Sequence, residues 1–334
     1  MISRVAEDCF WLLRNIERAN STARLLRVHS GMVLDAALPP SRTWRPLLIV
    51  LGEEPSFLER MGASKAVDGD AVLEYLTWDT RTGVSISRSL RAAREGARTI
   101  RETVSLEMWD TLNALWIWLT RGAGRRMYNR ERAAFYEEVT HRCHQFLGAC
   151  QSTMLHEEPF DFMRLGLNLE RANQTARILD LQYHALGPDS RGPESAVRAA
   201  EWIAILRACA AYEPFFKKRS APLSGPAVAE FLLLEPAFPG SVLHSLQRAR
   251  NFLRRIGGTA GRGPSSPSLA LVSQFVDDVE TLNLQEAFDE GIHQTLTSIV
   301  DRAADLAAAI REDYFAPQLP DAVATSTPGV TQDA

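Results

Sequence analysis

Apolar residues recur at every third or fourth position along almost the whole chain, which is the period of an amphipathic helix. Near the N-terminus this apolar stripe runs through Val5, Cys9, Leu12, Ile16, Ala19, Ala23 and Leu26. Alternating runs bounded by turn dipeptides, which would indicate strands, are nearly absent. The pattern therefore predicts an all-α protein with long helices at 3–35, 85–120, 130–155, 161–186, 194–213, 241–256 and 269–312.

Local signals predict where some helices begin and end. Ser85 and Ser241 precede two predicted helices, and serine is a favoured N-cap because its hydroxyl accepts a free backbone N–H. Asp68-Gly69-Asp70 and Thr80 to Gly83 have the composition of helix-initiating turns. From Pro317 to Ala334 the chain is small and polar, so we expect a disordered tail.

An eight-residue block occurs twice. Residues 17–24 read ERANSTAR and residues 170–177 read ERANQTAR, so seven of eight positions are identical at an offset of 153. Two weaker sequence matches between the halves occur in the same order along each half. One begins at Ser85 and Ser241, and the other at Trp44 and Trp202. A periodic match of this kind indicates duplication. It predicts a pseudo-symmetric helical bundle of two halves, 1–153 and 154–316, that form one compact unit.

The repeated blocks carry polar residues that a helix does not need in order to fold. In the first copy they are Glu17, Arg18, Asn20 and Arg24, and in the second copy Glu170, Arg171, Asn173 and Arg177. The helical face that bears them is partly apolar, and an isolated buried charge is costly, so the glutamates should be paired with arginines. Three interpretations remain open: structural ties between two helices, a polar ligand site at the pseudo-twofold axis, or a partner interface.

Composition and charge narrow the class of protein. Of the 334 residues, 46% are hydrophobic and 23% charged, as in an ordinary globular protein. The net charge of −4 disfavours a general nucleic-acid binder. We find neither a leader pattern nor an apolar run that could span a membrane. The cysteines form no CxxC pair, and with the other features they predict reduced thiols and a cytoplasmic location; they are Cys9, Cys143, Cys150 and Cys209.

Other constellations give weaker signals. His141, Cys143 and His144 lie together but lack the spacing of a zinc site, so no metal site is predicted. A glycine-rich phosphate loop is absent, so no cofactor is expected in this chain, and no complete catalytic set is visible. Arginines at three- and four-residue steps suggest either a solvated helix face or a docking face for an acidic partner; they are Arg88, Arg91, Arg94 and Arg98.

The chain resembles the alpha-E family of bacterial helical domains, which have a repeated Glu-Arg motif and no known function. The resemblance extends to about residue 315. It is carried by Ser3–Glu7, Phe10–Leu12 and Ile16–Ala19 in the first half, and by Phe162, Leu165-Gly166 and Leu169–Ala172 in the second. One position departs from the pattern: Leu13 stands where a glycine such as Gly166 is expected.

The resemblance implies a function that the residues do not reveal. Such proteins are associated with circularly permuted ATP-grasp ligases, and often with a transglutaminase-like protease. We therefore expect a helical accessory subunit of an amide- or peptide-forming ligase, with ATP and Mg on the partner ligase. The alternative is a free-standing enzyme, with Glu17 or Glu170 as general base beside Arg24 or Arg177, or a protein that binds a small ligand at the duplicated site.

Overall fold

The computed structural model describes residues 3–36, 43–186, 196–218, 222–259 and 266–316, and every regular element in these ranges is a helix. The all-α prediction is therefore confirmed. The expected disordered tail lies outside the described residues. None of the described helices combines the length and the apolarity needed to cross a membrane.

The first half of the chain begins with the long N-terminal helix. In order, its helices are α1 (Ser3–Ala36), α3 (Arg45–Val50), α4 (Glu54–Met61), η1 (Ala63–Val67), α5 (Gly69–Trp78), α6 (Ile86–Thr99), α7 (Leu106–Thr120), α8 (Ala123–Arg130) and α9 (Arg132–Thr153). Those of the second half are α10 (Glu158–Leu186), α11 (Ala196–Ala208), α12 (Tyr212–Lys218), α13 (Gly225–Leu234), α14 (Val242–Thr259), α15 (Pro267–Glu280), α16 (Leu284–Glu290), α17 (Ile292–Ile310) and the terminal turn η2 (Arg311–Phe315).

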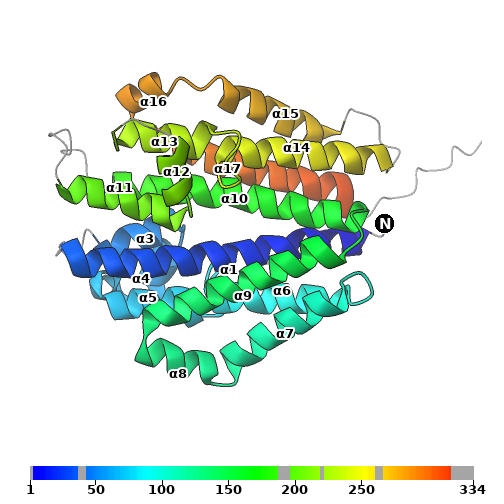
Figure 1. Cartoon of the computed structure of the whole chain (residues 1–334), viewed down its shortest axis with the longest axis horizontal. Coiled ribbons are helices and arrows are strands. Elements are labelled where there is room, and N and C mark those ends of the chain that lie inside the picture. Colours follow the sequence, from blue (N-terminus) through cyan, green and yellow to red (C-terminus); the bar gives the residue numbers. More distant parts are fainter. Residues whose placement is uncertain (1–2, 37–42, 187–195, 219–221, 260–265, 317–334) are drawn as a thin grey trace, which may run out of the picture.

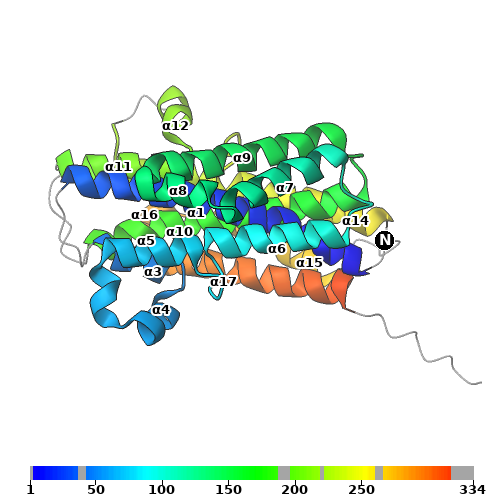
Figure 2. The ribbon, with the colours of Figure 1, turned by 90° about the horizontal axis from the view of Figure 1, so that it is seen from below.

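Helices α1 and α10 lie side by side through the middle of the molecule (Figure 1). Helices α6 and α9 pack on α1, whereas α14 and α17 pack on α10. Figure 2 shows α9 and α17 on opposite sides of the α1–α10 pair. The two central helices are thus covered by other helices, which is why even their polar residues are largely buried.

The α1 and α10 backbones approach each other closely at Gly166. A Cβ atom at this position would lie 2.1 Å from the carbonyl oxygen of Phe10, closer than any real contact. Only glycine fits such an approach without moving a helix. At the equivalent position of α1, Leu13 is completely buried, so the close approach is made on the α10 side alone.

The sequence predicted three helices that are in fact interrupted. The predicted 85–120 helix is divided by residues 100–105, and the Ser105 hydroxyl caps the start of α7. The predicted 194–213 helix breaks after Ala208, where Ala210 adopts a φ of 55°. The predicted 269–312 helix is three helices, separated by the Asn283 cap and by Gly291 with a φ of 108°. In each case helical periodicity continues through a short turn, so periodicity alone did not locate the break.

The predicted serine caps are confirmed. The backbone N–H of Arg88 donates to the Ser85 hydroxyl at 3.1 Å, and that of His244 donates to the Ser241 hydroxyl at 3.1 Å. Each serine hydroxyl also donates to a backbone carbonyl six residues earlier, at 2.5 Å for Ser85 and 2.6 Å for Ser241. The capping interpretation thus accounts for both serines.

Equivalent positions of the two halves make matching contacts. The ring of Trp44 lies against Gly69, and the ring of Trp202 lies against Gly225; a Cβ on these glycines would meet the rings at 2.5 and 2.7 Å. These contacts agree with the sequence match at Trp44 and Trp202. The division into two pseudo-symmetric halves stays a prediction, which superposition of residues 1–153 on 154–316 would test.

Candidate functional site

The packing of α1 on α10 brings the two Glu-Arg blocks together. Arg18 Nε donates to Glu170 Oε1 at 2.7 Å, and a second Arg18 nitrogen donates to Glu170 Oε2 at 2.9 Å. In the reverse sense, Arg171 Nε lies 3.4 Å from Glu17 Oε1. Each glutamate therefore faces the arginine that directly follows the other glutamate, and the paired residues come from different helices.

Glu170 is fully engaged. Besides Arg18, it accepts hydrogen bonds from Arg14 Nε at 2.9 Å and from the Gln174 amide at 2.9 Å, and it is completely buried. Burial alone would raise the pKa of this carboxyl, but the charges of Arg18 and Arg14 hold its pKa well below the usual range. A carboxylate with a low pKa and occupied lone pairs is a poor general base. Glu170 acts as an ionic tie between α10 and α1.

Glu17 occupies the equivalent position but is poorly engaged. Apart from the longer contact to Arg171, Glu17 Oε1 accepts only a 3.4 Å hydrogen bond from Ser21. Glu17 Oε2 accepts no hydrogen bond from any described residue. The position equivalent to Arg14 is Leu167, which is apolar and buried, so no second arginine reaches Glu17 from there.

The last arginines of the two blocks differ in the same way. Arg177 donates to Asn173 Oδ1 at 3.2 Å and to the carbonyl of Val50, the last residue of α3, at 2.6 Å. Arg24 makes only a 3.5 Å hydrogen bond to the carbonyl of Ala208, the last residue of α11. Asn20 Oδ1 accepts no hydrogen bond from the described chain. Glu17, Asn20 and Arg24 of the first block are therefore less saturated than Glu170, Asn173 and Arg177, their equivalents in the second.

A cavity of about 190 Å³, called here the Glu17 cavity, lies beside the first block. Its polar walls include Glu17, Asn20, Arg24, His144, Arg171 and Gln174. It adjoins a groove of about 1060 Å³ between α1, α9, α11 and α12, and both are lined by Arg24, His144 and Ala210. Residues of both blocks line the cavity, but Glu17 is among them and Glu170 is not, so the two glutamates differ in access as well as in hydrogen bonding.

Three oxygens in the cavity walls have no donor among the described residues: Glu17 Oε2, Asn20 Oδ1 and Gln174 Oε1. They are shielded from solvent, so each lies just behind the cavity surface rather than on it. Leaving such an acceptor unpaired costs about 1–3 kcal/mol. A small side-chain rotation that turned these oxygens toward a donor in the cavity would recover that free energy.

The other lining groups favour binding over nucleophilic chemistry. Burial raises the pKa of the Cys209 thiol to about 12, so the thiolate nucleophile is scarce near neutral pH. Burial, together with the charge of Arg24, lowers the pKa of His144, so this imidazole is neutral. The cavity walls thus combine residues that carry acceptor oxygens with two guanidinium groups, those of Arg24 and Arg171.

The arginine row of α6 is largely exposed. Arg88 and Arg91 face solvent. Arg94 is half-buried and donates to Asn113 at 2.9 Å, and both Arg94 and Arg98 pair with Glu95 at 3.1 and 3.0 Å. The row is therefore a partly neutralised face whose unneutralised charge lies in its N-terminal half.

Sequence reasoning missed several residues that the structure makes important. Arg14 lies outside the repeated block, and Gln174 is the one mismatch within it, where the first block has Ser21. That mismatch was the available signal, because Gln174 reaches Glu170 closely while Ser21 reaches Glu17 only at 3.4 Å. Sequence reasoning also missed that Asp180 and His184, four residues apart on α10, converge with His293 of α17. Cys143, which was considered with two histidines of the same helix, is instead buried in the core.

Two central helices joined by reciprocal Glu-Arg contacts define an all-helical protein with a duplicated Glu-Arg site. The chain belongs to the Alpha-E family, described as a predicted alpha-helical domain with a conserved ER motif, which it matches over residues 1–315. Glu17-Arg18 and Glu170-Arg171 both have the ER sequence.

Similar proteins have been recorded in mycobacteria. An uncharacterized protein of Mycobacterium bovis and uncharacterized proteins of two Mycobacterium tuberculosis strains are each 23% identical to this chain over 336 residues. The match covers 92% of this chain but 36% of each relative, so the chain spans about a third of their length. No solved structure matches the chain significantly.

Proposed function

We propose that this protein is a helical accessory subunit of an ATP-grasp-type ligase that forms amide or peptide bonds, and that it binds a small amine-bearing molecule in the Glu17 cavity. The observation that carries the binding role is the contrast between two equivalent glutamates. Glu170 is saturated by two arginines and an amide, whereas Glu17 keeps an unpaired oxygen beside a cavity. A purely structural duplication would need no such difference.

The chemistry of the cavity walls indicates the ligand class. An ammonium group offers N–H donors to Glu17 Oε2, Asn20 Oδ1 and Gln174 Oε1, which lack donors among the described residues. The guanidinium groups of Arg24 and Arg171 suit a carboxylate. A cavity of about 190 Å³ suits a molecule of amino-acid size, and the adjoining groove offers room for a longer peptide. We therefore assign the cavity to a free amino acid or to the end of a short peptide, a natural reactant for an amide-forming ligase.

The accessory role has separate support. It follows from the family resemblance, which associates such proteins with ATP-grasp ligases and often with a transglutaminase-like protease; ATP and Mg would then bind the ligase. The mycobacterial relatives are about three times as long as the matched region, so in them this region is joined to further chain. That arrangement supports a helical unit that works together with a second protein unit. A general-base role for Glu170 fits the geometry poorly, because its carboxylate is already occupied.

Removing the charge of Glu17 is expected to abolish most ligand binding with little loss of stability. Free amino acids and dipeptides, screened by thermal shift, should raise the melting temperature of the wild-type chain, since ligands that bind only the folded state stabilise it. Their N-acetyl derivatives, which lack the ammonium group, should not. For a ligand found in this way, Glu17→Gln should weaken binding about 10- to 100-fold in calorimetry, as loss of a charged hydrogen bond would.

Glu107→Gln is the matched control, because Glu107 is exposed on α7 and lines neither the Glu17 cavity nor the adjoining groove. It should leave the affinity unchanged. If no amino acid or dipeptide stabilises the wild-type chain, or if Glu17→Gln binds as tightly as wild type, the cavity holds only water and the binding role is wrong.

Charge reversal on α6 is expected to weaken the complex with the ligase. Arg88 and Arg91 carry the exposed, unneutralised charge of the row, so Arg88→Glu with Arg91→Glu should slow association with an acidic surface, more strongly at low salt. Binding kinetics with an ATP-grasp protein from the same organism would measure this. The isolated chain should bind no ATP.

Two other exposed arginines provide the control: Arg121→Glu with Arg130→Glu makes the same change in net charge on a different surface. Equal effects of the two double variants would remove α6 from the interface. Absence of any complex with the ATP-grasp protein, or micromolar ATP binding by the isolated chain, would overturn the accessory role while leaving the cavity assignment intact.

A further inference from the structure

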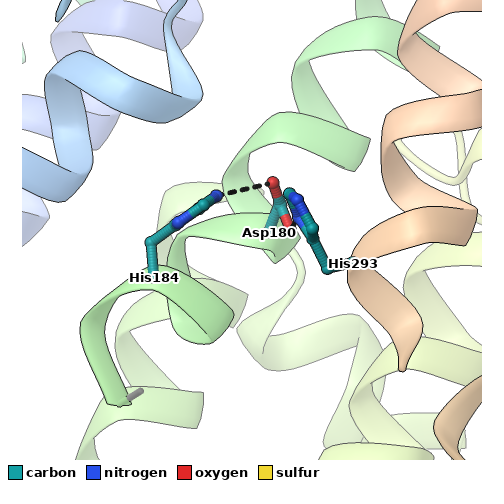
Figure 3. Close-up of side chains that lie close together, drawn as sticks. All are labelled: Asp180, His184 and His293. Atoms are coloured by element: carbon teal, nitrogen blue, oxygen red, sulfur yellow. Dashed lines mark hydrogen bonds and ion pairs between the residues drawn. The ribbon is translucent and has the colours of Figure 1, made fainter. Parts of the chain in front are cut away.

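Three potential metal ligands converge where α10 meets α17, and none of them lines the Glu17 cavity (Figure 3). Asp180 and His184 lie one turn apart on α10, and His293 lies near the start of α17. His293 Nδ1 is 2.8 Å from Asp180 Oδ1, and His184 Nε2 is 3.4 Å from Asp180 Oδ2. One ligand atom from each residue lies within 4.8 Å of the other two.

We propose that Asp180, His184 and His293 bind a divalent transition-metal ion, with zinc as the best fit. Two imidazole nitrogens and one carboxylate oxygen are the protein ligands of zinc sites that keep a fourth position for water. Zinc bonds of about 2.0–2.2 Å place neighbouring ligand atoms of a tetrahedral site about 3.4 Å apart. The two histidines contact different oxygens of Asp180, at 2.8 and 3.4 Å. Because one ligand atom from each residue already lies within 4.8 Å of the other two, no pair needs to close by more than about 1.4 Å to reach this value.

The surroundings allow an ion to enter. The Asp180 side chain is 12% exposed, and those of His184 and His293 are 20% and 33% exposed. The two imidazole rings pack edge to face, with their centroids 4.9 Å apart. One nitrogen of each ring is turned toward the Asp180 carboxylate, as Figure 3 shows. A largely buried carboxylate flanked by two partly exposed imidazoles thus offers three ligand atoms that an ion can reach from the side of the rings.

Among the described residues, Arg177 is a cation near the cluster, but it forms no ion pair with Asp180. Arg177 is close enough for the charges of Asp301 and Asp180 to act on its pKa, which burial lowers. Its guanidinium group is already directed elsewhere, to Asn173 and to the Val50 carbonyl. The negative charge of Asp301 also offsets part of the repulsion between Arg177 and a metal ion. A bound ion would tie α17 to α10 and stabilise the fold.

The test uses the full-length chain without a polyhistidine tag, stripped with a chelator. Titration with Co²⁺ should give the visible absorption of a four-coordinate ion at one equivalent, and Zn²⁺ should displace it. Asp180→Asn, His184→Gln and His293→Gln should each weaken Zn²⁺ binding in calorimetry by more than the roughly 10- to 100-fold that loss of an outer-shell partner costs. Zn²⁺ should also raise the melting temperature of the wild-type chain.

Two controls make the assignment specific. His244→Gln removes a histidine of α14 whose ring nitrogen lies 2.7 Å from the Pro236 carbonyl, and it should leave Zn²⁺ binding unchanged. His141→Gln with His144→Gln removes the histidine pair of α9 and should also leave it unchanged. Circular dichroism of the stripped variants checks folding, and Asp180→Asn keeps the shape of the cluster if a histidine variant fails to fold. Affinity that follows His141 and His144, or that survives all three ligand substitutions, would refute the site.

Discussion

Glu170→Gln is expected to lower the free energy of unfolding by about 3–5 kcal/mol, the usual cost of breaking one side of a buried ion pair. Glutamine keeps the shape of the side chain but leaves the charges of Arg14 and Arg18 without their carboxylate in the centre of the α1–α10 contact. Both guanidinium groups are largely buried, so water cannot take the place of the lost carboxylate. Urea unfolding followed by circular dichroism would measure the loss, which corresponds to about 6–15 °C in melting temperature at roughly 2–3 °C per kcal/mol.

Glu17→Gln is the matched control for this prediction. Its pair with Arg171 is longer, at 3.4 Å, and the Arg171 side chain is 24% exposed, so we expect a loss of about 1 kcal/mol or less. Equal destabilisation by the two substitutions would show that the asymmetry seen between the glutamates has no energetic consequence. That result would also remove the main support for the Glu17 cavity as a ligand site.

The pH dependence of the Glu170 effect has a definite sign. The pKa of the Glu170 carboxyl is lower in the folded protein than its ordinary value of 4.5. The unfolded chain therefore takes up a proton first as the pH falls, and the stabilisation by Glu170 is fully present above pH 4.5. The difference in stability between wild type and Glu170→Gln should shrink progressively as the pH falls below that value.

Gly166→Ala is expected to destabilise the protein by about 2–4 kcal/mol. The new methyl group would lie 2.1 Å from the Phe10 carbonyl oxygen and 3.0 Å from the Phe10 carbonyl carbon, both backbone atoms that cannot rotate away. The helices must separate, which costs about 1–3 kcal/mol or more for overpacking. Separation also stretches the Glu170 ion pairs one turn further along α10. These losses exceed the roughly 1 kcal/mol that alanine gains over glycine in a helix.

Gly148→Ala makes the same chemical change where space is free. Gly148 lies within α9, and a Cβ there would meet no atom within 4 Å. This substitution should stabilise the protein by up to about 1 kcal/mol, so the two alanines are expected to act in opposite directions in the same urea experiment. A Gly166→Ala variant as stable as the wild type would mean that α1 and α10 do not meet at this glycine.

The helical fold could be predicted because its signals are local. The apolar stripe of α1, the Ser85 and Ser241 caps and the extent of α10 all depend on residues within a few turns of one another. The breaks at 100–105, at Ala210 and at Gly291 were missed because the apolar period carries through them. A turn of a few residues can preserve the stripe while the chain changes direction.

The candidate site was only partly predictable. Its residues were visible as a repeated block, and the need to pair a buried glutamate with an arginine followed from the cost of burying charge. The partners were not visible: Arg24 and Arg177, each on the helical face of its own glutamate, bond elsewhere, whereas Arg18 and Arg171 cross to the opposite helix. Which arginine reaches a carboxylate depends on how two helices pack, and no local spacing encodes that.

The sequence by itself determined an all-helical chain with a duplicated Glu-Arg block and the places where several of its helices start. Only the tertiary structure decided that the two copies differ. Arg14 and Gln174 enclose Glu170, while Leu167 and Ser21 leave Glu17 open to a cavity. It also joined Asp180 to His293, which are 113 positions apart. The physical reason is that hydrogen bonding and burial are set by neighbours in space, so nearly identical octapeptides can have different environments.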